Sequence, residues 1–168
     1  MKCTMIKVVV FDLDGTLVHL PINYEKLFTE FRKIIGMSNI HPLTQKISEL
    51  DAKTKKKVFD VWNNFEIEAV SNLRLNTEGM GFYKKFSKKR KALVTMQGKP
   101  VVDVITGRLK LHFDAIITRE ETLNRSEQLK IVAQKLGVSL TNVLFVGNTK
   151  EDSLAAEKVG CKFLEVGE

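Results

Sequence analysis

The sequence predicts an α/β fold of three layers, in which helices cover both faces of a parallel β-sheet and a small helical insert follows the first strand. Short apolar runs rich in β-branched residues alternate with segments of helical periodicity, which is the pattern of consecutive βαβ units. The first run, residues 6–11 (IKVVVF), is almost continuously apolar, as expected of a strand buried on both faces. Residues 17–71 contain no strand-like run, and they interrupt the alternation with the insert.

Four further strands are expected after this insert. They correspond to apolar runs at residues 92–95, 115–118, 143–146 and, more weakly, 162–166. Helical spacing of apolar residues predicts helices at residues 81–91, 99–109, 126–136 and 151–159. Gly137 and Gly160 directly follow the last two of these helices, and glycine at that position is a helix stop signal.

The insert is expected to form three helices, near residues 24–35, 43–50 and 54–70. A βα crossover needs far fewer residues than the segment provides. We therefore expect residues 17–75 to form a small helical cap over one end of the sheet, and residues 1–16 and 76–168 to form the core.

Length and composition exclude several classes of protein. The 168 residues fit one core with a small insert, and 43% hydrophobic residues are enough to fill it. No stretch reaches the roughly 18 apolar residues of a membrane span, and Asp12 and Asp14 follow the first apolar run instead of a cleavage site. We therefore expect no signal peptide and no membrane partner. Only two cysteines, Cys3 and Cys161, are present, which favours a reducing, cytoplasmic setting.

The net charge of +7 is unevenly distributed. Residues 17–91 contain 15 Lys and Arg against 8 Asp and Glu, whereas the rest of the chain contains 12 of each. A basic surface attracts phosphorylated ligands or nucleic acid, although runs of charge are commonly solvated surface. Since no zinc finger, RNP-type sequence or recognition helix is evident, nucleic acid is not expected as a partner. The lysine-rich cluster before the second strand should lie at the amino end of the sheet, away from catalysis.

Two carboxylates follow the first strand directly, in Asp12-Leu13-Asp14-Gly15-Thr16. Ligands of open α/β sheets bind at the carboxyl ends of the strands, and Gly15 allows a sharp turn there. Three structural alternatives are a hairpin turn at Asp14-Gly15, a calcium loop, and a helix cap at Asp14. The calcium loop fails, because Leu17 occupies its glycine position.

These residues resemble the first motif, DxDGT, of the haloacid dehalogenase superfamily, a large group of aspartate-nucleophile phosphatases with a Rossmann-like core. The resemblance implies that Asp12 is the nucleophile, that Asp14 is the general acid and base, that Thr16 lies in the phosphate site, and that Mg²⁺ is the cofactor. It also argues against dehalogenation, because family members that cleave carbon–halogen bonds lack the second acid.

The resemblance extends to the other strand ends. It implies that Thr95, with the backbone at Met96, binds phosphate, and that Arg125 occupies the position of the family's lysine. Lys130 is the alternative, although it lies further into the helix. The implied metal set consists of Asp12, Asp14, Asn148 and Asp152.

Two of these motifs depart from the family's residues. Arg125 replaces lysine, and a guanidinium is a planar fork where an ammonium is a point charge. Asn148 replaces the usual aspartate; its amide oxygen can still coordinate a hard cation, but with one negative charge fewer. Asp152 has an alternative interpretation as an acidic residue at a helix N-terminus.

We therefore expect a Mg²⁺-dependent hydrolase of small phosphate monoesters, similar to the phosphoglycolate phosphatase-like group, acting as a monomer or homodimer. A phosphomutase is a close variant. The alternative function is a catalytically degenerate relative that binds phosphate or a partner. Candidates for reading the substrate's leaving group are His19, Asn23, Lys26 and Arg74.

Overall fold

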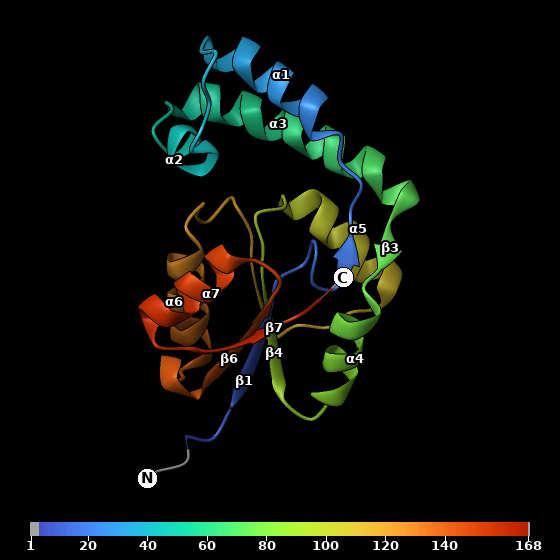
Figure 1. Cartoon of the computed structure of the whole chain (residues 1–168), viewed down its shortest axis with the longest axis vertical. Helices are drawn as coiled ribbons and strands as arrows, with labels where there is room; N and C mark the ends of the chain where they lie inside the picture. The colour runs from blue at the N-terminus through green and yellow to red at the C-terminus, as the bar shows by residue number, and fades with distance from the viewer. Residues whose placement is uncertain (1–3, 168) are drawn as a thin grey trace.

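Five parallel strands form the central sheet in the computed structural model, which describes residues 4–167 (Figure 1). Their order across the sheet is β5-β4-β1-β6-β7. The strands are β1 (Val8–Phe11), β4 (Arg90–Val94), β5 (Ala115–Ile117), β6 (Val143–Gly147) and β7 (Lys162–Glu165). All five predicted strands are confirmed. Cys3 lies outside the described residues, and Cys161 is a free, half-buried thiol.

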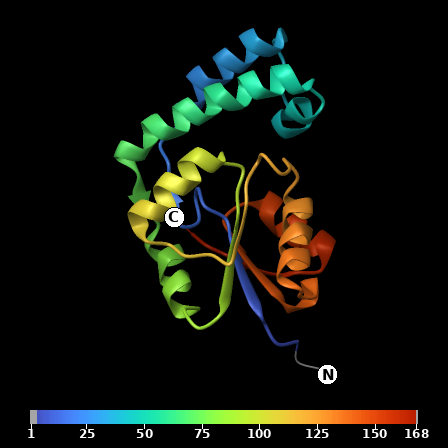
Figure 2. The same ribbon diagram turned by 180° about the vertical axis from the view of Figure 1, so that it is seen from behind.

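Helices cover both faces of this sheet (Figures 1 and 2). They are α4 (Thr77–Lys85) and α5 (Lys99–Leu109) on one face, and α6 (Arg125–Leu136) and α7 (Lys150–Val159) on the other. Alternate residues of β1 point to opposite faces: Val9 packs in the layer that contains α5, and Val10 packs in the layer that contains α6 and α7. Across residues 4–167, no helix combines the length and apolarity of a membrane span.

One helix prediction is displaced. The sequence pattern predicted a helix at residues 81–91, whereas α4 runs from Thr77 to Lys85. It begins earlier because the Asn76 side chain accepts a hydrogen bond from the Gly79 backbone N–H and caps the helix. It ends earlier because Arg90 already pairs with Val8 in the sheet. The lysine-rich turn lies at the amino end of the sheet, as predicted, where Lys89 Nζ donates to the Ile6 carbonyl at 2.9 Å.

The segment between β1 and β4 forms the predicted helices above the carboxyl end of the sheet (Figure 1). They are α1 (Tyr24–Ile35), α2 (Leu43–Ser48), α3 (Ala52–Ala69) and the 3₁₀ turn η1 (Val70–Asn72). The expectation that residues 17–71 contain no strand is wrong at Val18–His19. Two-residue strands β2 (Val18–His19) and β3 (Arg74–Leu75) pair in antiparallel orientation. A pairing of this length depends on a partner far along the chain, so it leaves no periodic pattern in the sequence.

The helical segment packs on the core through one continuous hydrophobic cluster. Phe31 of α1 and Trp62 of α3 belong to the same cluster as Phe11 of β1 and Val101 of α5. The rings of Phe31 and Trp62 meet edge to face with centroids 5.5 Å apart. The helical segment therefore shares one apolar core with the sheet and α5.

Candidate active site

The predicted site residues gather where the strands end. Asp12 follows β1, Thr95 follows β4, and Asn148 follows β6. The Asp12 backbone N–H donates to the Val146 carbonyl at 3.0 Å, which continues the parallel pairing to the sheet edge. Asp12 is 5% exposed and Thr95 is fully buried.

Arg125 joins two of the predicted carboxylates. Its Nη2 donates to Asp12 Oδ1 and its Nε donates to Asp152 Oδ1, each at 3.0 Å. Arg125 is the first residue of α6, so its backbone is fixed by a rigid element. Lys130, the alternative, lies further along α6 and pairs with Glu127 at the surface. The geometry therefore places Arg125, and not Lys130, beside the expected nucleophile.

Asp152 also has the helix-terminal position that the sequence allowed as an alternative. Its Oδ2 accepts from the Asn148 and Thr149 backbone N–H groups at 3.3 and 3.4 Å. The Thr149 hydroxyl accepts in return from the Asp152 N–H, which completes a capping box at the start of α7. Both carboxylate oxygens of Asp152 are thus engaged by protein groups.

Asp14 faces a different set of partners. Its Oδ1 accepts from the Leu20 backbone N–H at 2.8 Å, as the chain enters the helical segment. The adjacent Gly15 has φ of 82° and approaches Asn148 so closely that a Cβ there would lie 2.2 Å from Asn148 Nδ2. The Thr16 hydroxyl donates to Asn148 Oδ1 at 3.2 Å. The loop after β1 is therefore interlocked with the loop after β6.

The Thr95 hydroxyl is turned toward its own loop. It is hydrogen-bonded to the Gln97 side-chain oxygen, and it accepts from the Gln97 backbone N–H at 3.1 Å. Met96 lines a cavity beside Arg125 and Asp152. Thr95 and Met96 thus lie at the site, with the hydroxyl of Thr95 satisfied by Gln97.

Sequence reasoning missed two side chains that hold these loops, one glutamine and one asparagine. Gln128 Nε2 donates to the Thr95 carbonyl at 2.8 Å, and its Oε1 accepts from Arg125 Nη1 at 2.7 Å. Asn76 Nδ2 donates to the Gly15 carbonyl at 3.1 Å. Gln128 lies three residues after Arg125 on α6, a spacing that puts both on one helix face and could have identified it. Asn76 carries no comparable signal.

Burial dominates the electrostatics of the two carboxylates after β1. It raises the pKa of Asp12 to about 7; the Asp152 carboxylate adds to this rise, and the Arg125 guanidinium opposes it. Burial also raises the pKa of Asp14, against the hydrogen bond from the Leu20 N–H. A raised pKa at Asp14 suits a carboxylic acid that donates a proton.

The site can be tested for its fit to Mg²⁺ by its charge and its donor atoms. Asp12, Asp14 and Asp152 carry three potential negative charges against the single guanidinium of Arg125. Carboxylate and amide oxygens are the ligands that this cation prefers. Across residues 4–167, however, no three His, Cys, Asp or Glu side chains already converge as a metal centre. The donor atoms nevertheless fit a hard cation, because Asp12 and Asn148 offer side-chain oxygens that do not take part in the capping box of α7.

A cavity of about 570 Å³ lies beside the Arg125–Asp152 pair, at the N-termini of α6 and α7. Thr44 of α2 also lines this cavity. Helix N-termini are favourable places for anions because their backbone N–H groups are free of intrahelical partners. Arg125 and Asp152 line this cavity, whereas Asp12, Asp14 and Thr95 do not, and side-chain caps from Asn124 and Thr149 already occupy N–H groups of the two helix ends.

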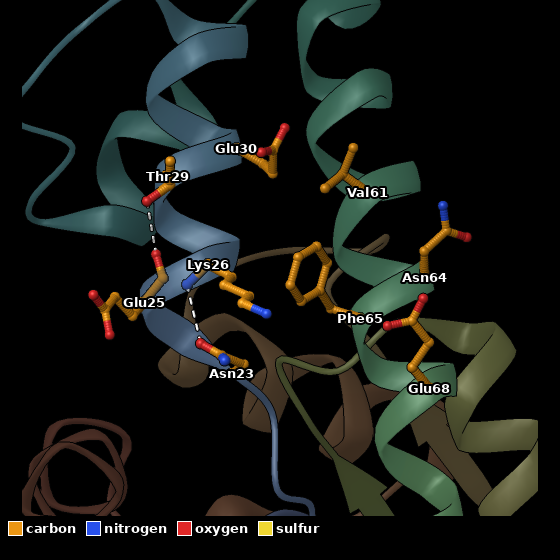
Figure 3. Close-up of a pocket in the computed structure, with 9 residues that line it drawn as sticks. All are labelled: Asn23, Glu25, Lys26, Thr29, Glu30, Val61, Asn64, Phe65 and Glu68. Carbon is orange, nitrogen blue, oxygen red and sulfur yellow. Dashed lines mark hydrogen bonds between the residues drawn. The ribbon is translucent and has the colours of Figure 1, made fainter.

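A second hollow, of about 580 Å³, lies between α1 and α3 (Figure 3), and none of the carboxylates described above lines it. Two of the four candidate substrate readers, Asn23 and Lys26, line it, and Asn23 also caps α1 by accepting from the Lys26 backbone N–H at 3.1 Å. The other two, His19 and Arg74, line a separate hollow along β2 and β3. The structure does not bring these four residues together with Arg125.

Comparison with known proteins gives a consistent result. The sequence pattern of the haloacid dehalogenase-like hydrolase family matches residues 9–166. A protein from Clostridium perfringens named PpaX, described as a candidate pyrophosphatase, is 29% identical over 94% of this chain and 82% of its own length. The haloacid dehalogenase-like protein SP0104 from Streptococcus pneumoniae superimposes with a TM-score of 0.70 at 20% identity, covering 97% of this chain and 87% of that one.

CbbY from Rhodobacter sphaeroides, whose structure contains phosphate, also superimposes with a TM-score of 0.70. It is 14% identical and covers 98% of this chain and 87% of its own. At such identities the superpositions establish the shared fold.

Proposed function

Because the chain belongs to the haloacid dehalogenase-like hydrolase family, we propose that it is a Mg²⁺-dependent phosphatase that hydrolyses small phosphate monoesters through an aspartyl-phosphate. The observation that carries this proposal is the Arg125 guanidinium bridging Asp12 and Asp152 at the sheet edge. It holds the Asp12 carboxylate in a fixed orientation beside a positive charge, where a phosphoryl group would be stabilised. Asp14, two residues on, supplies the second carboxyl group.

In the first half of the proposed reaction, an oxygen of Asp12 attacks phosphorus while the bond to the leaving oxygen breaks. Asp14 gives its proton to that leaving oxygen, so that an alcohol departs. In the second half, Asp14 accepts a proton from water as the water oxygen attacks phosphorus. The bond to Asp12 then breaks, inorganic phosphate is released, and both carboxyl groups return to their starting states.

The proposed phosphate contacts are Arg125 and the loop after β4. Arg125 and Met96 line the cavity beside the site, and Thr95 would turn its hydroxyl from Gln97 to a phosphate oxygen. Thr16 would hold Asn148 in place through the bond that it already makes. CbbY, which shares this fold, contains phosphate, and this supports a phosphate site in the same kind of scaffold.

Asp12 and Asn148 would hold Mg²⁺ directly, with Asp14 and Asp152 adding negative charge around it. When bound, the ion would reduce the repulsion between the Asp12 carboxylate and the phosphate. We propose that residues 17–75 act as the cap of a core formed by residues 1–16 and 76–168, and that the protein acts in the cytoplasm. The cap would exclude water from the carboxylates and restrict the leaving group.

The test is hydrolysis of a generic aryl phosphate and of inorganic pyrophosphate by the full chain. Each is measured with Mg²⁺ and with a chelator, and Asp12→Asn is the matched control. We expect release of phosphate that needs Mg²⁺ and is absent in the variant. Turnover of pyrophosphate alone would shift the substrate class toward that described for PpaX. No turnover of either compound, together with tight binding of phosphate, would favour the alternative of a catalytically degenerate relative.

Restoring an acid in the loop after β6 gives a second prediction. Asn148→Asp adds one negative charge among hard oxygen donors, and ligand charge is a main determinant of divalent cation affinity. The Mg²⁺ concentration for half-maximal activity should fall by about tenfold, close to 1.4 kcal/mol of binding free energy. A Mg²⁺ titration of the aryl phosphatase rate measures this. An unchanged midpoint would exclude Asn148 as a ligand.

A further inference from the structure

Arg119, which follows β5, is buried where α3 meets the core. Its side chain is fully buried, and so is that of its ion-pair partner Glu66. Arg119 Nη1 donates to Glu66 Oε1 and its Nη2 donates to Asn63 Oδ1, each at 2.5 Å. Both acceptors belong to α3, so the Arg119 guanidinium adds a buried polar link between the helical segment and the core.

The same ion pair also holds the loop after β4. Arg119 Nη1 donates to the Met96 carbonyl at 3.0 Å, and Glu66 Oε2 accepts from the Gly98 backbone N–H at 3.1 Å. The approach at Gly98 is close, since a Cβ there would lie 2.1 Å from Asn63 Oδ1 and 2.6 Å from Arg119 Nη2. Both ends of the segment 96–98 are therefore held by groups that α3 positions.

This segment is joined to the nucleophile by further hydrogen bonds. Gln97 is bonded to the Thr95 hydroxyl, and Gln128 bridges the Thr95 carbonyl and Arg125. Arg125 in turn contacts Asp12. A continuous set of polar contacts thus runs from α3 to the expected nucleophile.

The buried Arg119–Glu66 ion pair is weak evidence for a role in folding stability. Taking a guanidinium and a carboxylate out of water costs free energy that their attraction often only offsets. Arg119 is also stacked on Trp62, with its guanidinium carbon 4.2 Å from the ring centroid, which fixes its plane. In this orientation Nη1 donates to both Glu66 and the Met96 carbonyl while Nη2 donates to Asn63.

We propose that Arg119 and Glu66 are positioning residues for phosphate binding: through them, α3 sets the placement of the loop 95–98 that receives the phosphate group. This inference rests on the proposed phosphate site. It predicts that disturbing the pair weakens phosphate binding, although neither side chain lies among the residues that line the cavity at Arg125.

The test compares Arg119→Lys with the matched control Arg108→Lys in the full chain. Arg108 also joins core to cap, since its Nη1 donates to the Val70 carbonyl at 3.1 Å, but within residues 4–167 it makes no hydrogen bond or ion pair to the loop 95–98. Lysine keeps the charge at position 119 and loses the fork that reaches Met96 and Asn63. The readouts are the affinity for inorganic phosphate by calorimetry, and KM and kcat for an aryl phosphate at matched folded fraction.

We expect phosphate affinity to fall by about tenfold or more in Arg119→Lys, which corresponds to losing a hydrogen bond to a charged group. KM should rise in parallel, while kcat falls less. Arg108→Lys should leave affinity and KM unchanged. Equal affinities in the two variants, with only a lower melting temperature in Arg119→Lys, would show that the pair is merely structural and overturn the inference.

Glu66→Gln is the second variant, for use if Arg119→Lys does not fold. It keeps the shape, but its NH₂ group must face a donor, either Gly98 N–H or Arg119 Nη1, so phosphate affinity should still fall severalfold. Unchanged phosphate affinity in Glu66→Gln would contradict the inference.

Calorimetry also distinguishes a failure of the proposed phosphatase function from a failure of the positioning role. If the wild-type protein is inactive but its phosphate affinity falls in Arg119→Lys, the phosphatase proposal is wrong and the positioning role stands. If the wild-type protein is active but its phosphate affinity is unchanged in Arg119→Lys, the positioning role is wrong and the phosphatase proposal stands. A wild type that neither hydrolyses esters nor binds phosphate removes both.

Discussion

Asp12→Asn should lower the rate of phosphate ester hydrolysis by at least about a thousandfold. In metal-free protein at neutral pH, the same substitution should raise the free energy of unfolding. The activity is lost because an amide cannot form the aspartyl-phosphate. The fold gains stability because a buried carboxylate costs desolvation free energy that Arg125 offsets only in part. The asparagine side chain has the same shape, and its oxygen can still accept from Arg125 Nη2.

The stability gain should depend on pH in a defined direction. The pKa of Asp12 is about 7 in the folded protein, above its ordinary value of 3.8. Between these two values the folded chain holds a proton that the unfolded chain releases, so the stability contributed by that proton is present below about pH 4 and lost as the pH rises to about 7. The variant lacks this titration. Its advantage in unfolding free energy should grow over this range to at most about 4 kcal/mol, at 1.36 kcal/mol per pKa unit.

Urea denaturation of both proteins in chelator, at a series of pH values from 4 to 8, measures this advantage. Aryl phosphate hydrolysis with Mg²⁺ measures the catalytic loss on the same preparations. A difference in unfolding free energy that stays constant over the pH series would contradict the raised pKa of Asp12. Residual Mg²⁺-dependent turnover in the variant would contradict its role as nucleophile.

Gly79→Ala should destabilise the protein by about 3 kcal/mol and reduce activity, although alanine is the better helix former. Gly79 lies in the first turn of α4, where an added Cβ would lie 1.7 Å from the Thr16 carbonyl oxygen and 2.8 Å from its carbonyl carbon. Backbone cannot rotate away as a flexible side chain can, so α4 or the loop after β1 must shift. Overpacking of this kind commonly costs about 1–3 kcal/mol and sometimes more. The shift would also move Thr16 and its bond to Asn148.

Gly81→Ala is the matched control in the same helix. No atom lies within 4 Å of a Cβ added at Gly81, so this variant should gain up to about 1 kcal/mol from helix propensity. Thermal or urea unfolding of both variants, with aryl phosphate turnover, tests the pair of expectations. Equal stabilities for the two alanine variants would show that the contact between α4 and Thr16 does not restrict position 79.

The sheet could be predicted from the sequence because its strands carry their own signal. β1 and β6 are short apolar runs buried on both faces, and Gly137 and Gly160 mark helix ends locally. The positions that could not be predicted depend on contacts far along the chain. β2 exists through its pairing with β3, and the start of α4 depends on an Asn76 cap whose amide also holds Gly15.

The candidate site divides in the same way. Asp12, Arg125 and Asp152 were predicted from motif positions at strand ends and a helix start, and the structure brings them into direct contact. Arg119 was not singled out, because the sequence around it describes a polar loop after a strand. Its burial requires Glu66, 53 positions earlier in the chain, and no local pattern connects the two. The orientation of the Thr95 hydroxyl toward Gln97 likewise follows from the loop's own hydrogen bonds.

The pairing of β2 with β3 has a consequence for how this architecture can change. Val18 lies opposite Leu75, and His19 lies opposite Arg74, so the chain leaves and re-enters the core at neighbouring points on its perimeter. Residues 20–73 thus leave and rejoin the chain at one place beside the sheet, so that an insertion, deletion or exchange within them would leave the strand order unchanged. The buried charge of Arg119 sets the condition for such an exchange, since any replacement module must bring its own acceptor for the guanidinium or the core must give up the arginine at the same time.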